Sequence, residues 1–343
     1  MLFIYAPNVH QGGGRSLLDA LLRTISISSK VIALLDSRMP APEGLQIRRI
    51  IPTVIERFKA ERWLSDNVRS RDVILCFGNL PPLFKLRGHT IVFLQNRYLI
   101  DEVKLNGFSM YIKARITFER MWLLAKLTNV DEFIVQTPTM KRLLEIKTLG
   151  KMPIHILPFM DLPKDYSFSS APEVFTKYDH YDFLYVASGE PHKNHIRTVE
   201  AWCILAKEGL FPSLRLTLDE VRFSTLCQDI EQLRQRHGLK IINLGLLPHS
   251  DVLLLYIYVD ALIYPSKLES FGLPLIEAMH AGLPVLASEL DYVRDLFDPE
   301  QTFDPDSAVS IARAVKRFIG YKEPPLQLQD ASKFMKFILK KLE

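Results

Sequence analysis

The sequence predicts an α/β protein made of two similar domains, each with a parallel, helix-covered sheet. This prediction rests on three observations. Short apolar runs alternate with longer helical patterns, the alternation is interrupted once at residues 160–181, and the 343 residues exceed what a single hydrophobic core usually organises. Because 48% of the residues are apolar, a disordered polymer is excluded.

The first predicted domain spans residues 1–160, and its apolar runs favour buried strands. In chain order these runs are MLFIYAP, KVIALLD, RDVILCFGN, TIVFLQN, EFIVQT and IHILPF. Two segments with helical periodicity, RSLLDALLRTI and PTMKRLLEI, lie between them. Since strands joined by helical crossovers pair in parallel, this order predicts a parallel sheet.

The second predicted domain spans residues 181–320. It follows a loose stretch rich in Pro, Ser and Asp, MDLPKDYSFSSAPEVFTKYDHY, which is interpreted as a linker. The same alternation then resumes with DFLYVAS, a helix over residues 194–208, and the strands LRLTL, IINLG, DALIYPS and PVLAS. Residues 321–343 are predicted to form a C-terminal helix that crosses back to the first domain.

The cysteine content and the length of the apolar runs favour a cytoplasmic protein. The cysteines Cys76, Cys203 and Cys227 are odd in number and lie far apart without metal-type spacing, so neither a disulfide framework nor a zinc site is expected. No apolar run reaches the roughly 18–20 residues that span a bilayer. The opening MLFIYAPNVH lacks the basic start and the long apolar stretch of a signal peptide.

Charge is distributed unevenly along the chain. Residues 1–164 carry 24 Lys and Arg against 14 Asp and Glu, a net +10, whereas residues 165–343 carry a net −6. A basic first half suits an anionic partner such as phospholipid headgroups or a phosphate-bearing acceptor, because each clustered cation contributes about 1 kcal/mol at such a surface. A solvated basic face is the alternative. Nucleic acid is not an expected partner, since the sequence has no helix-turn-helix, zinc-finger or aromatic-stacking signature.

One helical segment, residues 110–127, combines large apolar side chains with basic ones. Packing of the apolar residues in the core, with a solvated basic face, is the favoured interpretation, and a helix lying in a membrane interface is the alternative. The terminal segment SKFMKFILKKLE leaves the same two interpretations open. The apolar members of residues 110–127 are Met110, Tyr111, Phe118 and Trp122, and the basic members are Lys113, Arg115, Arg120 and Lys126.

Residues 264–288, YPSKLESFGLPLIEAMHAGLPVLAS, favour a strand end, a turn and a short helix. The strand ends near Ser266, Pro274 suits the first helical position, and Gly282 followed by Pro284 ends the helix. Open parallel sheets bind ligands outside the carboxyl ends of their strands. The backbone N–H groups of residues 271–273 are therefore expected at a helix N-terminus, where unpaired donors and the helix dipole favour an anion such as phosphate.

Two glutamates flank this turn, and their positions indicate different partners. Glu277 lies about one turn into the predicted helix, and helical side chains tilt towards the N-terminus, so its carboxylate can reach a hydroxyl of a ribose beside the phosphate. Glu269 approaches from the strand side, where it can accept hydrogen bonds from the hydroxyls of a sugar. In the alternative interpretation, Glu277 interacts only with the helix dipole and Glu269 is a solvated loop residue.

The same segment resembles the signature of retaining glycosyltransferases of family 4 (group 1), which have two Rossmann-like domains with parallel sheets facing a central cleft, the GT-B fold. The family pattern is approximately P-S-x-x-E-G/S-F-G-L-P-x-x-E-A-M-A-x-G-x-P-V, and His280 is the notable variation here. The residues in register are Pro265, Ser266, Glu269, Ser270, Phe271, Gly272, Leu273, Pro274, Glu277, Ala278, Met279, Gly282, Pro284 and Val285.

This resemblance implies roles for the matched residues. It implies that Glu269 contacts the donor sugar, that the turn offers backbone N–H groups to the donor, and that Glu277 binds the ribose. The donor-binding residues of this segment are then Glu269, Ser270, Phe271, Gly272, Leu273 and Glu277.

A second segment, FLYVASGEPHKNHIRTVEAW, resembles the first strand, loop and helix of the family's donor domain. Lys193 matches the lysine that neutralises the donor diphosphate, so Lys193 and Glu269 are the predicted catalytic residues and Asn194 is a predicted donor-binding residue. Many family members carry an arginine where this sequence has Ala187, and Arg15 is the candidate substitute. His192 and His195 have no carboxylate or cysteine partner in the sequence pattern, so a metal site is not expected.

A glycine-rich segment, VHQGGGRSLLDALL, follows the first strand. It lacks the full spacing of a dinucleotide-binding loop, but glycines allow close approach of the backbone to a ligand. In the resembling family this loop faces the donor across the cleft, which makes Gly13, Gly14 and Arg15 candidate donor-binding residues. His10 is a candidate on the acceptor side, with packing at the strand end as the alternative.

Within the segment VFLQNRYLI, a predicted strand ends in three polar residues. In the resembling family, residues at this position often line the acceptor side of the cleft. Gln95, Asn96 and Arg97 are therefore acceptor-side candidates. Asp304 and Asp306 have the spacing of a metal-binding D-x-D motif. However, a proline lies between them and they follow the last strand of the second domain, so a loop is expected.

The resemblance implies transfer of a hexose-type sugar from a nucleotide-sugar donor to an acceptor hydroxyl with retention of configuration. The departing phosphate accepts the incoming proton, which explains why no nucleophile and base appear at glycosidase-like spacing. No metal or other cofactor is required. The alternatives are another GT-B enzyme, such as a nucleotide-sugar epimerase or a sugar-phosphate synthase, and a non-catalytic nucleotide-sugar-binding homologue.

The expected setting is the assembly of a bacterial surface polysaccharide, namely O-antigen, capsule or lipopolysaccharide. The acceptor is then a glycan or a lipid-linked glycan. Together with the basic first half, this setting suggests peripheral binding to an anionic membrane surface at the cytoplasmic face of the inner membrane.

Overall fold

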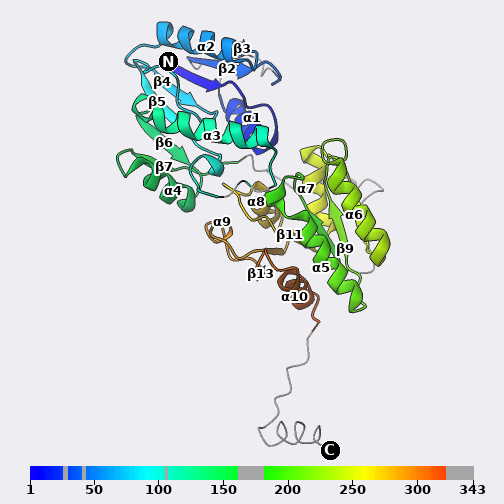
Figure 1. Ribbon diagram of the computed structural model, residues 1–343. Helices are drawn as coiled ribbons and strands as arrows, with labels where there is room; N and C mark the ends of the chain where they lie inside the picture. The colour runs from blue at the N-terminus through cyan, green and yellow to red at the C-terminus, as the bar shows by residue number, and fades with distance from the viewer. Residues whose placement is uncertain (26–29, 41–43, 104, 106, 161–180, 322–343) are drawn as a thin grey trace, which may run out of the picture.

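The computed structural model describes residues 1–25, 30–40, 44–103, 105, 107–160 and 181–321, and it shows two helix-covered parallel sheets (Figure 1). The first sheet has the order β3-β2-β1-β4-β5-β6-β7, and each described pairing in it is parallel. Its strands are β1 (Leu2–Ala6), β2 (Val31–Asp36), β3 (Gln46–Ile50), β4 (Val73–Cys76), β5 (His89–Phe93), β6 (Glu132–Val135) and β7 (Ile154–Ile156). The helical segments of this half are α1 (Gly12–Arg23), α2 (Val54–Asn67), η1 (Arg97–Leu99), α3 (Met110–Ala125), η2 (Leu127–Asn129) and α4 (Pro138–Thr148).

The second sheet has the order β10-β9-β8-β11-β12-β13, again with parallel pairings. Its strands are β8 (Asp182–Tyr185), β9 (Ser213–Leu216), β10 (Ile241–Asn243), β11 (Ala261–Tyr264), β12 (Val285–Ser288) and β13 (Gln301–Phe303). The helical segments are η4 (Pro191–Lys193), α5 (His195–Lys207), α6 (Ser224–His237), α7 (His249–Tyr258), α8 (Leu273–His280), α9 (Asp291–Arg294) and α10 (Ala308–Phe318). The predicted pair of Rossmann-like parallel sheets is therefore confirmed.

Each sheet reverses its strand order beside its first strand. β1 lies between β2 and β4, and β8 lies between β9 and β11. In open parallel sheets, ligands bind outside the carboxyl ends of the strands at such a reversal. The segments that follow β1, β8 and β11 are therefore where a ligand site is expected.

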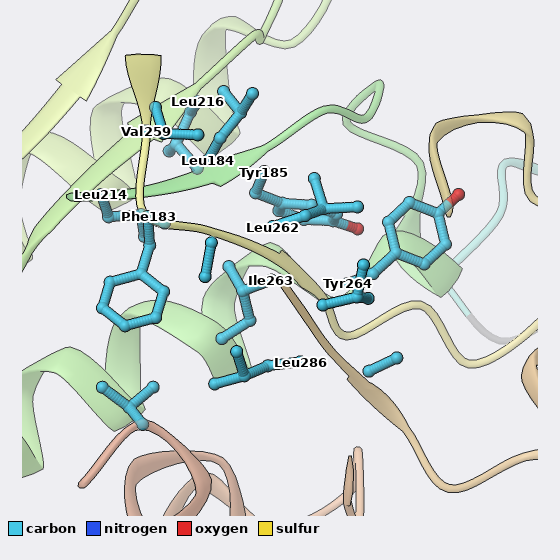
Figure 2. Packing of buried hydrophobic residues seen from close by; sticks show 14 of the residues in the cluster. Phe183, Leu184, Tyr185, Leu214, Leu216, Val259, Leu262, Ile263, Tyr264 and Leu286 are labelled. Atoms are coloured by element: carbon cyan, nitrogen blue, oxygen red, sulfur yellow. The ribbon is translucent and has the colours of Figure 1, made fainter. Parts of the chain in front are cut away.

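The core of the second half explains why its strands appear in the sequence as short, continuous apolar runs. Every residue of β8, β9, β11 and β12 is buried, as expected for a parallel sheet that is covered on both faces. Figure 2 shows Phe183 and Leu184 packed with Leu262 and Ile263 in this core. The hydroxyl groups of the tyrosines that end β8 and β11 lie at the opposite end of the cluster from Phe183.

The predicted strands are all present, and the structure adds two. β3 has the sequence QIRRI and is mostly exposed, so it lacks the apolar run of a buried strand. β13 has only three residues, QTF. Both strands lie at an edge of their sheet, where burial imposes the weakest pattern on the sequence.

The glycine-rich segment corrects one expectation, because it is not a loop before the first helix. α1 begins at Gly12, so the glycines form its first turn. Gly12 has φ +66°, a left-handed conformation that glycine adopts without steric cost. The helical periodicity of the sequence begins only at Arg15, because the glycines contribute no apolar side chains to it.

Two expectations concern residues beyond the described ranges. The predicted linker and the helix predicted for residues 321–343 fall largely on residues 161–180 and 322–343, which lie outside the described residues. The domain boundaries therefore stay a prediction. Among the described residues, no helix is both long and apolar enough to cross a membrane.

Candidate active site

Lys193 and Glu269 meet at the carboxyl edge of the second sheet. Lys193 ends η4, which follows β8, and Glu269 lies in the loop after the neighbouring strand β11. The Nζ atom of Lys193 is 2.5 Å from Oε1 of Glu269, and their side chains are only 15% and 12% exposed. The hydroxyl of Tyr264 donates a second hydrogen bond to Glu269 at 2.9 Å. The two predicted catalytic residues therefore form one largely buried ion pair.

The negative charge of Glu269 is maintained against burial. Burial acts to raise the pKa of Glu269, but the adjacent Lys193 ammonium and the hydrogen bonds to the carboxylate together outweigh it and hold the pKa below its ordinary value. Burial and the same ammonium lower the pKa of His192 to about 4. At neutral pH the site therefore contains a carboxylate beside a neutral imidazole.

Backbone hydrogen bonds tie the Lys193 turn to the loop after β11. The carbonyl of His192 accepts from the N–H of Lys267 at 2.8 Å, and the carbonyl of Lys193 accepts from the hydroxyl of Tyr185. Asn194 has φ +66° and donates its amide to the carbonyls of Pro265 and Pro305 at 3.2 and 2.7 Å. The structure thus gives Asn194 a bracing role in this turn, while its predicted contact with a donor stays a prediction.

The turn before α8 has the expected form of an anion site. Gly272 is the N-cap residue of α8 with φ +77°, Leu273 is the first helical residue, and Pro274 follows it. A Cβ at Gly272 would also lie 3.0 Å from the side chain of Leu275, so glycine is required for two reasons. The N–H groups at this helix start follow Glu269 closely in the chain, and they suit a phosphate.

Glu277 does not behave as a solvated helix-start residue. Its side chain is buried on the face of α8 that contacts α7. His249 Nε2 lies 2.8 Å from Glu277 Oε1, and the Tyr256 hydroxyl donates to Oε2 at 2.9 Å. No local sequence pattern predicts either partner, because both come from another helix. Binding of a ribose by Glu277 stays a prediction.

The glycines of α1 reach this site from the first half. A Cβ at Gly13 would lie 3.0 Å from Cδ1 of Leu273, so α1 and α8 are in close contact. A Cβ at Gly14 would lie 3.6 Å from the side-chain oxygen of Gln95. Arg15, however, is 46% exposed and pairs with Asp19 in its own helix at 3.4 Å. The structure therefore brings Gly13 to the donor half but does not bring Arg15 to Lys193.

The predicted acceptor-side residues separate into different environments. The backbone N–H groups of Gln95 and Asn96 donate to the side chain of Asn79 at 2.6 and 2.9 Å, and Asn96 in turn caps η1. The Nδ1 atom of His10 lies 3.9 Å from the carboxylate of Asp36 at the end of β2. No observation tests whether these residues contact an acceptor.

The two halves contact each other around this site. Arg97 Nη1 donates to the carbonyl of Glu269 at 3.5 Å, and the ring of Tyr98 meets His192 edge to face at a centroid distance of 5.5 Å. Farther out, Arg142 pairs with Asp291 at 2.5 Å. In Figure 1, α8 lies where the two halves meet. Sequence reasoning missed these contacts because the partners are far apart in the chain.

Within the described part of the chain, no group of three or more His, Cys, Asp or Glu residues is arranged to hold a metal ion. Asp304 accepts a hydrogen bond from the N–H of Asp306 at 2.9 Å, which is the geometry of a turn. His195 interacts with the carbonyl of Ser188, and His192 packs on Phe108. These residues therefore serve the local fold.

Comparison with known proteins finds a family model and relatives that match part of the chain. Residues 170–333 match the family model for glycosyl transferases group 1. A stretch of 132 residues is 29% identical to the O-antigen chain mannosyltransferase B of Escherichia coli and covers 38% of this chain and 34% of that protein. This relative is therefore matched over only about a third of its length.

Two solved structures share the fold over almost the whole chain. A structure of HepE from Anabaena, in complex with UDP and glucose, has a TM-score of 0.64 at 13% identity and covers 92% of this chain and 89% of that chain. The lipopolysaccharide outer core galactosyltransferase WaaB has a TM-score of 0.62 at 17% identity, with 93% and 90% covered. At these identities the likeness is one of fold. The chain therefore has the GT-B fold, and its second half is similar to the glycosyl transferases of group 1.

Proposed function

We propose that this protein is a retaining glycosyltransferase that moves a hexose-type sugar from a nucleotide-sugar donor to an acceptor hydroxyl. The observation that carries the proposal is the ion pair of Lys193 and Glu269 beside the N-terminus of α8, at the reversal of the second sheet. This arrangement offers a cation and helix-end N–H groups for a diphosphate, and a carboxylate for sugar hydroxyls.

In the proposed reaction, the bond between the sugar C1 and the phosphate oxygen breaks while the acceptor oxygen attacks C1 from the same face. The acceptor proton passes to the departing phosphate. Negative charge accumulates on the nucleoside diphosphate, and the Lys193 ammonium and the N–H groups at the start of α8 stabilise it without reorganisation. No metal or other cofactor is invoked, because these groups supply the positive potential.

The ion pair can serve a donor without being broken. Lys193 Nζ carries three N–H donors and lies 2.5 Å from Glu269 Oε1, so its other donors can reach a phosphate. We infer that the diphosphate shares the ammonium with Glu269, and that the remaining acceptor sites of the carboxylate take hydrogen bonds from the sugar. The hydrogen bond from Tyr264 then keeps the carboxylate in place.

The nucleoside end of the donor is assigned to Glu277. Its two oxygens are held by His249 and Tyr256, but a carboxylate offers about four acceptor sites, so ribose hydroxyls can be added to these contacts. The sugar end lies towards Glu269 and the ribose end towards Glu277, so the diphosphate spans the turn before α8.

The proposed setting is the assembly of a bacterial surface polysaccharide on a glycan or lipid-linked acceptor. It is supported by the printed names of two similar proteins, an O-antigen chain mannosyltransferase and a lipopolysaccharide outer core galactosyltransferase. Hexosyl transfer is common to both names. The sugar itself is not assigned.

Peripheral contact with an anionic membrane is also proposed, and α3 supports it. The expectation that its apolar residues pack in the core is wrong for most of them, because only Ile116 and Leu123 are buried. Met110 is 78% exposed, and Tyr111, Phe118, Met121 and Leu124 are exposed as well. Apolar residues on a basic helix suit the headgroup region of a bilayer.

The neighbouring helix α2 extends this surface. Arg57 of α2 lies over the ring of Trp122 of α3 at 4.3 Å, so the two helices are adjacent. At the start of α2, Val54 is 87% exposed, and Ile55 and Phe58 are exposed too. Exposed apolar residues on adjacent helices are typical of a protein or membrane contact.

The basic residues of α3 do not all serve this surface. Arg120 donates to the carbonyls of Tyr98 and Asp101 at 2.7 and 2.8 Å, so it braces η1 and does not belong to a solvated basic face. Lys113, Arg115 and Lys126 are the remaining candidates for contact with lipid headgroups.

The experiment that tests the proposed activity is incubation of the purified protein with a panel of GDP- and UDP-hexoses, followed by mass spectrometry. Slow release of free sugar and nucleoside diphosphate from at least one donor is expected, because water can replace the acceptor. An isomeric nucleotide sugar would instead indicate an epimerase. Transfer that requires an added sugar phosphate would indicate a sugar-phosphate synthase, and binding without turnover a non-catalytic homologue.

A further inference from the structure

Two cations from different halves of the protein converge on Glu269. Lys193 of the second half contacts its carboxylate at 2.5 Å, and Arg97 of the first half donates from Nη1 to its carbonyl at 3.5 Å. The Arg97 side chain is only 16% exposed. A guanidinium with so little contact with water acts more strongly on a nearby anion than one on the surface.

The orientation of Arg97 is fixed from within its own half. Asp101 accepts from its Nε at 2.7 Å, and Asn96 caps the η1 turn that carries it. The carboxylate of Asp101 therefore holds the Nε edge of the guanidinium, while the Nη1 edge reaches the second half. A planar guanidinium with five N–H donors can serve both partners at once.

Aromatic packing holds the first half against the Lys193 turn. His192, the residue before Lys193, packs against Tyr98 and Phe108, with ring centroids 5.5 and 6.2 Å away. Tyr98 directly follows Arg97 in η1. The position of Arg97 relative to Lys193 is therefore set by packed rings and not only by one long hydrogen bond.

The charge at the site leaves a role for a second cation. The charge of Lys193 is balanced by Glu269, and a nucleoside diphosphate that leaves with its bonding electrons carries more negative charge than one ammonium balances. Ala187 packs against the apolar core of the second half and offers no charge, and Arg15 is 46% exposed on α1 and is not brought to Lys193. Arg97 is already beside the residue that is assigned to the donor sugar.

We propose that Arg97 is a donor-binding residue that reaches across from the first half to the β-phosphate of the nucleotide sugar. The β-phosphate is the one that carries the sugar, and Glu269 marks the sugar end of the site. This inference rests on the proposed function. It assigns Arg97 to the donor, whereas the sequence analysis predicts Arg97 on the acceptor side. It also means that the donor site is complete only when the two halves are in contact.

The test compares Arg97→Gln with Arg97→Lys and with Arg142→Gln as a matched control. Arg142 also joins the two halves, but its pair with Asp291 is more than half exposed at both ends. Dissociation constants are measured by calorimetry for GDP, UDP, GMP and UMP, since the monophosphates lack the β-phosphate.

For Arg97→Gln, we expect the diphosphate that binds the wild type to bind about 10–100-fold more weakly, the usual effect of losing a charged hydrogen bond. Affinity for the matching monophosphate should change by less than about threefold, because the monophosphate has no β-phosphate and its own contacts with the protein are not altered. Arg97→Lys should recover part of the loss, because it keeps the charge but not the fork geometry. Arg142→Gln should resemble the wild type for both ligands.

Three results would overturn the proposal. The first is a folded Arg97→Gln variant that binds the diphosphate as tightly as the wild type, which would leave the proposed function intact. The second is an equal loss for diphosphate and monophosphate, which would make Arg97 only a brace between the halves. The third is a wild type that binds neither GDP nor UDP, which would remove the proposed function as well. If Arg97→Gln does not fold, the same comparison is made with Arg97→Lys, for which a several-fold loss confined to the diphosphate is expected.

Discussion

Oε1 of Glu277 lies 2.8 Å from Nε2 of His249, which places the buried carboxylate of α8 against the first residue of α7. Tyr256, about two turns further along the same face of α7, donates to the other oxygen at 2.9 Å. A carboxylate that is held on both sides loses little conformational freedom when a ligand binds, so it is preorganised to accept hydrogen bonds from ribose hydroxyls.

Glu277→Ala should therefore weaken binding of a nucleoside diphosphate by roughly 1–3 kcal/mol, because ribose hydroxyls would be left without their acceptor. Calorimetry with GDP and UDP measures this difference. Tyr256→Phe is the control, since it removes one holding contact and keeps the carboxylate. Equal affinity of Glu277→Ala and the wild type would return Glu277 to a purely structural contact with α7.

Gly272→Ala should destabilise the protein more than Gly282→Ala. Both glycines have left-handed backbones, with φ +77° and +70°, so both substitutions carry a strain of about 1–2 kcal/mol. Only at Gly272 would the added Cβ also lie 3.0 Å from Leu275, whereas nothing lies within 4 Å at Gly282.

Chemical denaturation of both variants gives the two free energies of unfolding. Gly272→Ala should also weaken binding of GDP or UDP, because the strain moves the N–H groups at the start of α8. If the two variants lose stability equally and both bind nucleotide normally, the turn before α8 does not have the assigned role.

Replacing Lys113, Arg115 and Lys126 by glutamine should weaken binding to anionic vesicles about 100-fold at low salt, since each basic residue contributes about 1 kcal/mol at such a surface. Arg120 is left unchanged because it braces η1. Donor hydrolysis should be unaffected, since none of these three residues belongs to the proposed donor site.

Vesicle sedimentation at low and physiological salt measures this effect. The matched control replaces Lys207, Arg236 and Lys240 of the second half by glutamine and should leave vesicle binding unchanged. A wild type that sediments equally with neutral and anionic vesicles would contradict the membrane proposal and favour a soluble acceptor.

Much of the fold could be predicted because strands that are buried on both faces have continuous apolar sequences. β8 and β11 appear as continuous apolar runs, since every residue in them is buried. β3 was missed because its side chains are mostly exposed at a sheet edge. The start of α1 was misplaced because glycines at its first turn carry no periodic side chains.

The candidate site was predictable only where its residues share one local motif. The turn before α8 follows from Gly272 and Pro274, and the meeting of Lys193 with Glu269 follows from the resemblance to a known family together with adjacent strands. The contacts of Arg97 with Glu269 and of His249 with Glu277 depend on how separate elements pack. No local pattern records such a contact.

The most direct test of the central claim is the kcat for donor hydrolysis by Lys193→Ala, measured with the nucleotide-hexose that the wild type hydrolyses. Loss of one preorganised charge that stabilises a leaving group should lower kcat by about a hundredfold or more. Lys267→Ala is the control, because Lys267 lies in the loop after β11 but pairs with Asp306 outside the proposed site, and it should keep nearly wild-type kcat. A folded Lys193→Ala variant with unchanged kcat would contradict the account.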